Sequence, residues 1–245
     1  MESEFKMNNF MAIMLCMLLS VVFLIFKSYK TPLDSKSFLV NVYLYVLVAV
    51  LFIGLVGKYA ESLKITNVEN TWKMMILYFI MAMGGIFMMT YKELHLNHIG
   101  FLLMLLALSL IIGVSYKYSS NVSQAAAITA VIVSILTMFV FMSSEEELLR
   151  MTSWLPNLTS ILLGIIIIEL GYMFLFDYSM NFHKFMSITV ITLFIFFILS
   201  DTSRLIMESK NLECKTHDCI NYPLKASSLI LDYLNIFVRL LNDKH

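Results

Sequence analysis

Long apolar runs alternate with short polar connectors along most of this chain. Each run has about 18 to 22 residues, the length that an α-helix needs to cross a hydrocarbon core about 30 Å thick. The runs lack the strict polar–apolar alternation of a membrane β-barrel, so we interpret them as helices. The runs cover residues 8–26, 37–57, 72–91, 99–116, 122–142, 158–176, 185–205 and 220–241.

The first run, 8–26, needs a separate decision because an N-terminal apolar segment can be a signal peptide. It is longer than the apolar core of a typical signal peptide, and no small-residue cleavage pattern follows Lys27. We therefore expect it to be retained as a membrane anchor. The connector 28–36 is rich in lysine, with Lys30 and Lys36 near Lys27, and basic connectors favour the cytosolic side.

Composition places the chain in the class of polytopic membrane proteins. Of its 245 residues, 60% are hydrophobic and only 14% are charged, which lies outside the range of soluble globular domains. We predict an all-α transmembrane bundle with the lipid bilayer as its first partner. Basic and acidic residues number 17 each, so there is no basic excess that would indicate nucleic-acid binding.

No enzyme signature accompanies these helices. The sequence contains no H-E-x-x-H, no G-x-S-x-G and no glycine-rich phosphate loop. We therefore expect no catalytic residue, no enzymatic activity and no cofactor.

The cysteines, histidines and small residues are expected to have structural roles. Cys214 and Cys219 lie in one loop, where free thiols are the simplest expectation, and a disulfide is the alternative if the loop faces an oxidising lumen. His217 is the only further metal ligand nearby, so we expect no metal site. The five histidines lie at segment ends or in loops and are expected to be solvated. Ala82, Gly84 and Gly85 form a small-residue patch that would let helices approach closely.

A polar stripe runs along the last apolar segment. On a helix, residues spaced by three and four positions lie on the same face. The stripe consists of Lys225, Ser228, Asp232, Asn235 and Arg239. The rest of the bundle is interpreted as the container for this stripe.

Two aspartates of the last two segments are candidates for chemistry. Asp201 closes the apolar run 185–199, and Asp232 interrupts the last one. An ionisable group exposed to lipid costs about 3 kcal/mol or more, so such groups usually face a bundle interior or a wet cavity. If the two helices pack antiparallel, the two carboxylates can approach and share a proton. Fully ionised, they would offer an oxygen-only site for a hard cation such as calcium.

The alternative for these aspartates is local pairing, Asp201 with Arg204 and Asp232 with Arg239. Glu169 is a third acid, well inside its apolar run. An intramembrane acid is a functional candidate by default. A Glu that is hydrogen-bonded to a neighbouring helix would, however, have only a structural role.

The residues around these aspartates resemble the C-terminal signature of the Bax inhibitor motif (lifeguard-like) membrane family. Ser200-Asp201-Thr202 resembles the Asp-Thr at the end of the family's sixth span. The segment 229–237, LILDYLNIF, resembles the Leu-Tyr-Leu-Asp-x-x-Asn-Leu-Phe motif of its last span. Weaker matches follow in the same order: Phe38-Leu39 and Val42-Tyr43 in the first span, Leu96-Asn97 in the third, Gln124-Ala125 with Thr129 in the fourth.

The resemblance implies a seven-helix domain over residues 37–245, preceded by an N-terminal segment 1–36 with an extra hydrophobic helix. The chain departs from the family at three positions. Ser203 stands where many members have Gln, Leu108 stands where some have a Glu, and only Lys92 is available for the basic latch of the second span. These departures affect the expected permeation mechanism more than the expected fold.

The resemblance also implies a function. Related members are described as pH-sensitive calcium leaks with a diaspartyl gate, which would make Asp201 and Asp232 the gate and cation contact. The chain would then be a calcium leak in the endoplasmic reticulum, the Golgi or another endomembrane, or in the plasma membrane of a bacterium, and would inhibit cell death. The alternative is a non-conducting interaction protein that regulates death or stress signalling through other membrane proteins.

Overall fold

The computed structural model describes residues 2–62, 71–91, 95–118, 122–175 and 179–242, and every regular element within those ranges is helical. All of the predicted apolar runs form α-helices, so the all-α prediction is confirmed. The long helices are α1 (Glu2–Ser28), α2 (Ser35–Ser62), α3 (Thr71–Met89), α4 (Leu96–Tyr118), α5 (Val122–Met142), α7 (Leu155–Leu175), α8 (Met180–Lys210) and α9 (Tyr222–Asn242). The short elements are α6 (Glu145–Thr152) and the 3-10 turn η2 (His217–Cys219).

Six stretches of the described chain are long and apolar enough to cross a membrane, and the protein is therefore an integral multi-pass membrane protein. These stretches are Met11–Ser28, Ser35–Ala60, Leu96–Gly113, Val122–Met142, Glu145–Tyr172 and Met180–Lys210. The apolar part of α3 is shorter. α9 differs from the others because Lys225, Asp232 and Arg239 make it strongly amphipathic.

The helices group into two compact units. The first unit comprises Met1–Ser120 and Leu212–Ile230, and the second comprises Asn121–Asn211 and Leu231–His245. α9 contributes its first half to the first unit and its second half to the second. The predicted domain boundary after residue 36 stays a prediction.

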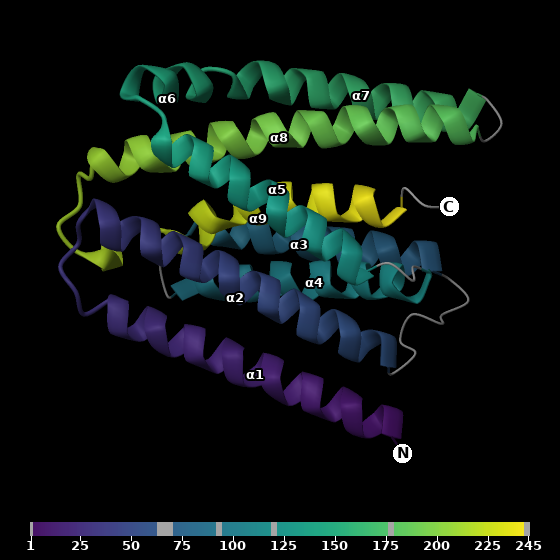
Figure 1. Ribbon diagram of the computed structural model, residues 1–245, viewed down its shortest axis with the longest axis horizontal. Helices are drawn as coiled ribbons and strands as arrows, with labels where there is room; N and C mark the ends of the chain where they lie inside the picture. Colours follow the sequence, from purple (N-terminus) through teal and green to yellow (C-terminus); the bar gives the residue numbers. More distant parts are fainter. Residues whose placement is uncertain (1, 63–70, 92–94, 119–121, 176–178, 243–245) are drawn as a thin grey trace. The chain divides into compact units, whose positions relative to one another are not determined.

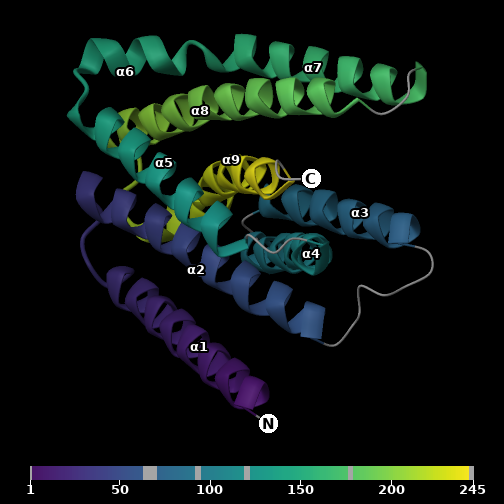
Figure 2. The same cartoon turned by 45° about the vertical axis from the view of Figure 1, so that its right-hand side comes forward.

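In the first unit, α1 packs along α2, α2 packs on α4, and α3 and α4 lie side by side (Figures 1 and 2). The closest approach joins α3 and α4 at two glycines. A Cβ on Gly85 would lie 2.6 Å from the Gly100 carbonyl oxygen, and a Cβ on Gly100 would lie 2.5 Å from the Gly85 oxygen. The adjacent Gly84 faces open space. Of the predicted small-residue patch, Gly85 therefore carries the close contact.

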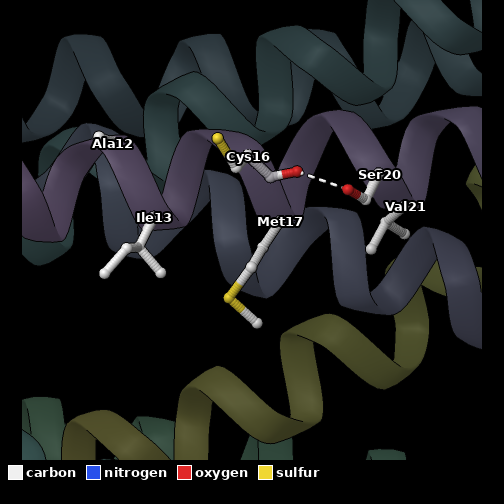
Figure 3. Close-up of a pocket in the computed structure, with 6 residues that line it drawn as sticks. All are labelled: Ala12, Ile13, Cys16, Met17, Ser20 and Val21. Atoms are coloured by element: carbon white, nitrogen blue, oxygen red, sulfur yellow. Dashed lines mark hydrogen bonds between the residues drawn. The ribbon is translucent and has the colours of Figure 1, made fainter.

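The exposed face of α1 is largely apolar from Met11 onward, with Ile13, Leu19, Phe23 and Phe26 all exposed. Figure 3 shows a shallow hollow there, lined by Ala12, Ile13, Cys16, Met17, Ser20 and Val21. Ser20 satisfies its hydroxyl within the helix by donating to the Cys16 carbonyl at 2.8 Å. Such a surface is what a lipid-facing helix presents.

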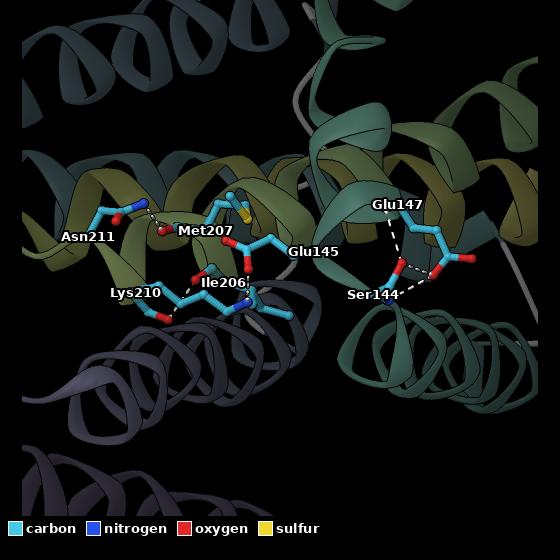
Figure 4. Close-up of polar contacts among 8 residues, drawn as sticks. Ser144, Glu145, Glu147, Ile206, Met207, Lys210 and Asn211 are labelled. Carbon is cyan, nitrogen blue, oxygen red and sulfur yellow. Dashed lines mark hydrogen bonds and ion pairs between the residues drawn. The ribbon is translucent and has the colours of Figure 1, made fainter.

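In the second unit, α5, α6 and α7 all pack on α8, and α6 and α7 follow it along its length (Figures 1 and 2). α6 begins with a capping box, in which the Ser144 hydroxyl accepts from the Glu147 amide and the Glu147 carboxylate accepts from the Ser144 amide (Figure 4). Lys210 of α8 lies 3.8 Å from the Glu145 carboxylate. The acidic run Glu145–Glu147 forms the first turn of this helix.

α8 is longer than its apolar run predicts. It extends from Met180 to Lys210, whereas the apolar run predicts 185–205. Asp201 therefore lies inside the helix, with about 14 Å of helix following it. Hydropathy marks the end of an apolar run, but the backbone ladder continues through polar residues such as Glu208 until Asn211 ends it.

Candidate functional site

Asp201 and Asp232 belong to the same unit, and both are buried. Asp201 is 8% exposed on α8, and Asp232 is 6% exposed on α9. Their carboxylates are close enough to repel each other when both are ionised. The structure therefore brings together the two aspartates that the sequence selects as a pair.

Several buried oxygens in the described part of the second unit have no hydrogen-bond partner. They include the Asp232 Oδ2 atom and the hydroxyls of Ser200 and Thr202, the two residues that flank Asp201. A buried polar atom without a partner costs about 1–3 kcal/mol, so native proteins retain few of them. Such an excess of acceptors is suited to water, a shared proton or a hard cation.

The carboxylates do not form a closed metal site. Within the described part of the chain, no group of three or more His, Cys, Asp and Glu side chains could hold a metal ion. Calcium takes six to eight oxygen ligands, so two carboxylates would leave most of its shell to water and hydroxyls. Two carboxylates alone therefore do not make up a complete calcium site.

Glu169 and Arg239 form an ion pair between α7 and α9. The two terminal nitrogens of Arg239 donate to the two carboxylate oxygens of Glu169, each at 2.8 Å. Both side chains are about one-fifth exposed. This two-pronged geometry is the strongest form of a charge-assisted hydrogen bond. The alternative in which Arg239 neutralises Asp232 is therefore wrong, and Glu169 is a structural partner of α9.

The remaining stripe residues are less buried than the sequence predicts. Asn235 is exposed, and its amide donates to the Leu231 carbonyl of its own helix. Ser228 is partly exposed, and its hydroxyl donates to the Lys225 carbonyl at 3.3 Å. The buried face of α9 is instead apolar, with Leu229, Ile230, Ile236 and Leu241 almost fully buried. The stripe lies beside this face, and only Asp232 enters the interior.

The other predicted positions have different outcomes. Arg204 is exposed, whereas Ser203 is fully buried and donates to the Met151 sulfur at 3.2 Å. Leu108 is partly exposed on α4. Lys92, the candidate latch, lies outside the described residues.

Sequence reasoning missed a polar cluster in the first unit, which centres on His217. This histidine is 3% exposed. Its Nε2 lies 3.0 Å from the Thr31 carbonyl, and because a carbonyl only accepts, Nε2 carries the proton. Nδ1 then accepts from the Tyr222 hydroxyl at 2.7 Å and from the Asn41 amide at 3.2 Å.

A second set of hydrogen bonds in this unit begins at the Met89 carbonyl. The Asn221 amide donates to it at 2.6 Å, so the Asn221 Oδ1 atom is the acceptor for the Asn97 amide at 3.3 Å. Asn97 Oδ1 in turn accepts from the His98 backbone N–H at 3.0 Å and from its Nδ1 at 2.8 Å. His98 is therefore protonated on Nδ1 in its neutral form.

The direction of these bonds continues through two tyrosines. With its proton on Nδ1, neutral His98 accepts at Nε2 from the Tyr45 hydroxyl at 2.8 Å. The Tyr45 oxygen then accepts from the Tyr29 hydroxyl at 3.3 Å. Burial raises the pKa of Tyr29, which keeps its hydroxyl protonated as a donor. From Tyr29 onward, each side chain in this series therefore donates to the next, and the last donor bonds the Met89 carbonyl.

Two expectations from the sequence are corrected here. His217 is buried and His98 is half-buried, although both were expected to be solvated. The apolar pattern gives no sign of this because the burial comes from packing of distant segments. Cys214 and Cys219 form a disulfide, although free thiols were expected.

Comparison with known families gives one match. A family model described as "Inhibitor of apoptosis-promoting Bax1" matches residues 35–242. The matched region begins at the first residue of α2 and ends at the last residue of α9, so α1 precedes it. No curated protein matches the chain.

Proposed function

The chain belongs to the Bax inhibitor motif family of cell-death inhibitors, and from that premise we propose that it is a passive, proton-regulated calcium leak. It would reside in the endoplasmic reticulum, the Golgi or another endomembrane, or in the plasma membrane if its host is a bacterium. Leakage lowers the calcium of the store and thereby damps death signalling.

The observation that carries this proposal is the buried pair of Asp201 and Asp232, with the Oδ2 atom of Asp232 unpartnered. A carboxylate that only stabilised the fold would be expected to have its acceptors satisfied. Here the fold retains an oxygen that is ready for a proton, a water molecule or a cation.

The pair supplies a mechanism for proton regulation. When both carboxylates are ionised, they repel each other and offer a doubly negative, oxygen-only contact for calcium. When the pair holds one proton, the repulsion is relieved and one carboxyl can donate a hydrogen bond to the other. The protonated pair holds α8 and α9 together and binds a cation weakly, which is the closed state.

The pair of Glu169 and Arg239 supports this arrangement. Arg239 lies two helical turns after Asp232, on the same side of α9. Its bond to α7 fixes the rotation of α9 and thereby the direction in which Asp232 points. Glu169 is thus a positioning residue in this mechanism, and no role as a pathway acid is needed.

The test is calcium efflux from proteoliposomes that contain purified protein. We expect flux from the wild type and little flux from Asp232→Asn, because the amide removes the charge that binds the ion. Asn235→Ala is the matched control, since Asn235 lies three residues away on the same helix but is exposed. No flux above empty liposomes from folded wild type would reject the leak, and equal non-zero flux from folded wild type and Asp232→Asn would reject the role of Asp232.

A second candidate is a non-conducting interaction protein that acts on other membrane proteins of death or calcium signalling. It is favoured by Leu108, which stands where some family members have an acid, and by the extra helix α1 that precedes the family match. Such a protein would protect cells equally well with Asp232→Asn. Cell survival under stress, measured with that variant at matched expression, separates the two functions.

A further inference from the structure

The loop between α8 and α9 combines two cysteines with the buried His217. The Cα atoms of Cys214 and Cys219 lie 6.1 Å apart, within the range that allows a bridge without movement of the backbone. Both cysteines are partly exposed, whereas His217 between them is buried. A reagent in water can therefore reach the sulfurs while the turn stays anchored.

His217 anchors this turn through contacts to three other segments of the first unit. Its ring bonds the Thr31 carbonyl, the Asn41 amide and the Tyr222 hydroxyl, and packs against the Tyr29 ring at a centroid distance of 5.6 Å. None of these contacts involves a sulfur atom. The anchor can therefore keep the two cysteines close whether the bridge is open or closed.

The contact with Thr31 also indicates the side of the membrane. It places the loop at the same end of the first unit as the connector between α1 and α2. Lys27, Lys30 and Lys36 make that connector basic, which favours the cytosolic side. Disulfides on that side meet a reducing thiol pool, and those that occur there are usually transient or redox-sensing.

We propose that Cys214 and Cys219 form a reversible thiol–disulfide pair that exchanges with cytosolic thiols, and that His217 is the positioning residue that holds them at bridging distance. This modification site is independent of the proposed leak. The loop that joins the two aspartate-bearing helices would then change between bridged and open forms with the redox condition of the cytosol.

The exchange needs a low-molecular-weight disulfide such as oxidised glutathione. The thiolate of one cysteine attacks a sulfur of that disulfide, forms a mixed disulfide and releases one glutathione thiolate. The second cysteine attacks the mixed disulfide, closes the Cys214–Cys219 bond and releases the second glutathione. The protein loses two electrons and two protons, and the two released glutathiones gain them. Reduction is the same sequence reversed.

The experiment uses the full-length chain in lipid nanodiscs with Cys16→Ser, which removes the exposed third cysteine. The protein is equilibrated with mixtures of reduced and oxidised glutathione, quenched in acid and alkylated. Mass spectrometry then gives the bridged fraction. We expect one two-electron transition between dithiol and disulfide within the range of cytosolic glutathione mixtures.

His217→Ala should shift this equilibrium toward the dithiol on the order of tenfold, because the freed loop lowers the effective concentration of one thiol at the other. Tyr222→Phe removes the hydroxyl that bonds Nδ1 but keeps the His217 ring, so it should shift the equilibrium less in the same direction, which keeps the test valid if His217→Ala misfolds. His95→Ala is the control, since its ring packs against His98 and not against the loop.

Three results would overturn the proposal. The first is glutathione attached to single cysteines with no bridge at any mixture. The second is a bridge that stays closed at every mixture, which would make it a permanent structural disulfide. The third is an unchanged equilibrium in folded Tyr222→Phe and His217→Ala. None of these readouts uses calcium flux, so failure here is distinct from failure of the leak.

Discussion

Both units bury polar groups and each keeps a buried oxygen without a partner, such as Asn41 Oδ1 in the first unit, but they differ in how their ionisable side chains are paired. In the first unit, His217 uses both ring nitrogens, and the bonds from Tyr29 to Met89 form one directed chain. In the second unit, Asp232 keeps an unpartnered carboxylate oxygen, and the hydroxyls of Ser200 and Thr202, which flank Asp201 in the sequence, are also unpartnered. A satisfied polar network helps to specify a fold, whereas a buried carboxylate with an unpartnered oxygen is retained at a cost that needs an explanation.

The comparison extends to packing. α3 and α4 of the first unit approach so closely that a single added methyl group would collide with backbone atoms. The second unit shows no such glycine among those described, because the Gly164 and Gly171 positions on α7 face open space. We therefore expect the first unit to be the less tolerant of added volume.

The largest expected effect comes from Gly85→Ala. The new Cβ would meet the Gly100 oxygen at 2.6 Å and the Met104 nitrogen at 2.7 Å, and backbone atoms cannot move aside as a flexible side chain can. We expect a loss of about 3 kcal/mol in the free energy of unfolding. Thermal unfolding in detergent measures it. Gly84→Ala is the matched control and should be nearly neutral; similar losses for both variants would contradict the close packing.

A smaller loss is expected when the ion pair of the second unit is broken. Glu169→Gln leaves the Arg239 charge without its partner in a partly buried site, which should cost about 2 kcal/mol. The reversed pair, Glu169→Arg with Arg239→Glu, should recover part of this loss. A double-mutant cycle on the unfolding free energy measures the coupling. Additive single effects would show that the pair does not fix α9.

Asp232→Asn is expected to increase the free energy of unfolding, in contrast to the two preceding substitutions. The substitution removes a buried carboxylate that is repelled by Asp201 and lacks one partner. We expect a gain of about 1 kcal/mol in the free energy of unfolding, measured by thermal unfolding above neutral pH. A gain in stability with a loss of flux is the signature of a site kept for function. A clear loss of stability would instead identify Asp232 as a structural residue.

The smallest effect concerns pH and the start of α2. The Asp34 carboxylate accepts from the Ser37 amide at 2.6 Å, and this bond holds the pKa of Asp34 below its ordinary value of 3.8. A lowered pKa in the folded state adds stability above the unfolded value, and the stability is lost as the pH falls through the folded pKa. Asp34→Asn keeps a capping oxygen but does not titrate. Below pH 3.8 the wild type should therefore lose stability relative to Asp34→Asn, and parallel acid profiles would contradict this.

Hydropathy is sufficient to predict the helices but not their partners. Apolar runs locate α1 to α5 and α7 because a membrane helix must be apolar over its whole length. The aspartate pair is also predictable, since Asp201 and Asp232 interrupt such runs. In contrast, the bond between Glu169 and Arg239 joins residues 70 positions apart. Likewise, His217 bonds Thr31 and Asn41, which lie 186 and 176 positions away, and no local pattern encodes these contacts.

The central claim is that Asp201 and Asp232 act as one proton-regulated unit. The most direct test is calcium efflux from proteoliposomes containing the wild type, Asp201→Asn, Asp232→Asn and the double variant, from mildly acidic to mildly alkaline pH. If the pair is one unit, each single variant should lose the pH-dependent flux, and the double variant should lose little more. The claim would be contradicted if pH-dependent flux survived in either folded single variant. It would also be contradicted if the flux losses of the two single variants added up in the double variant.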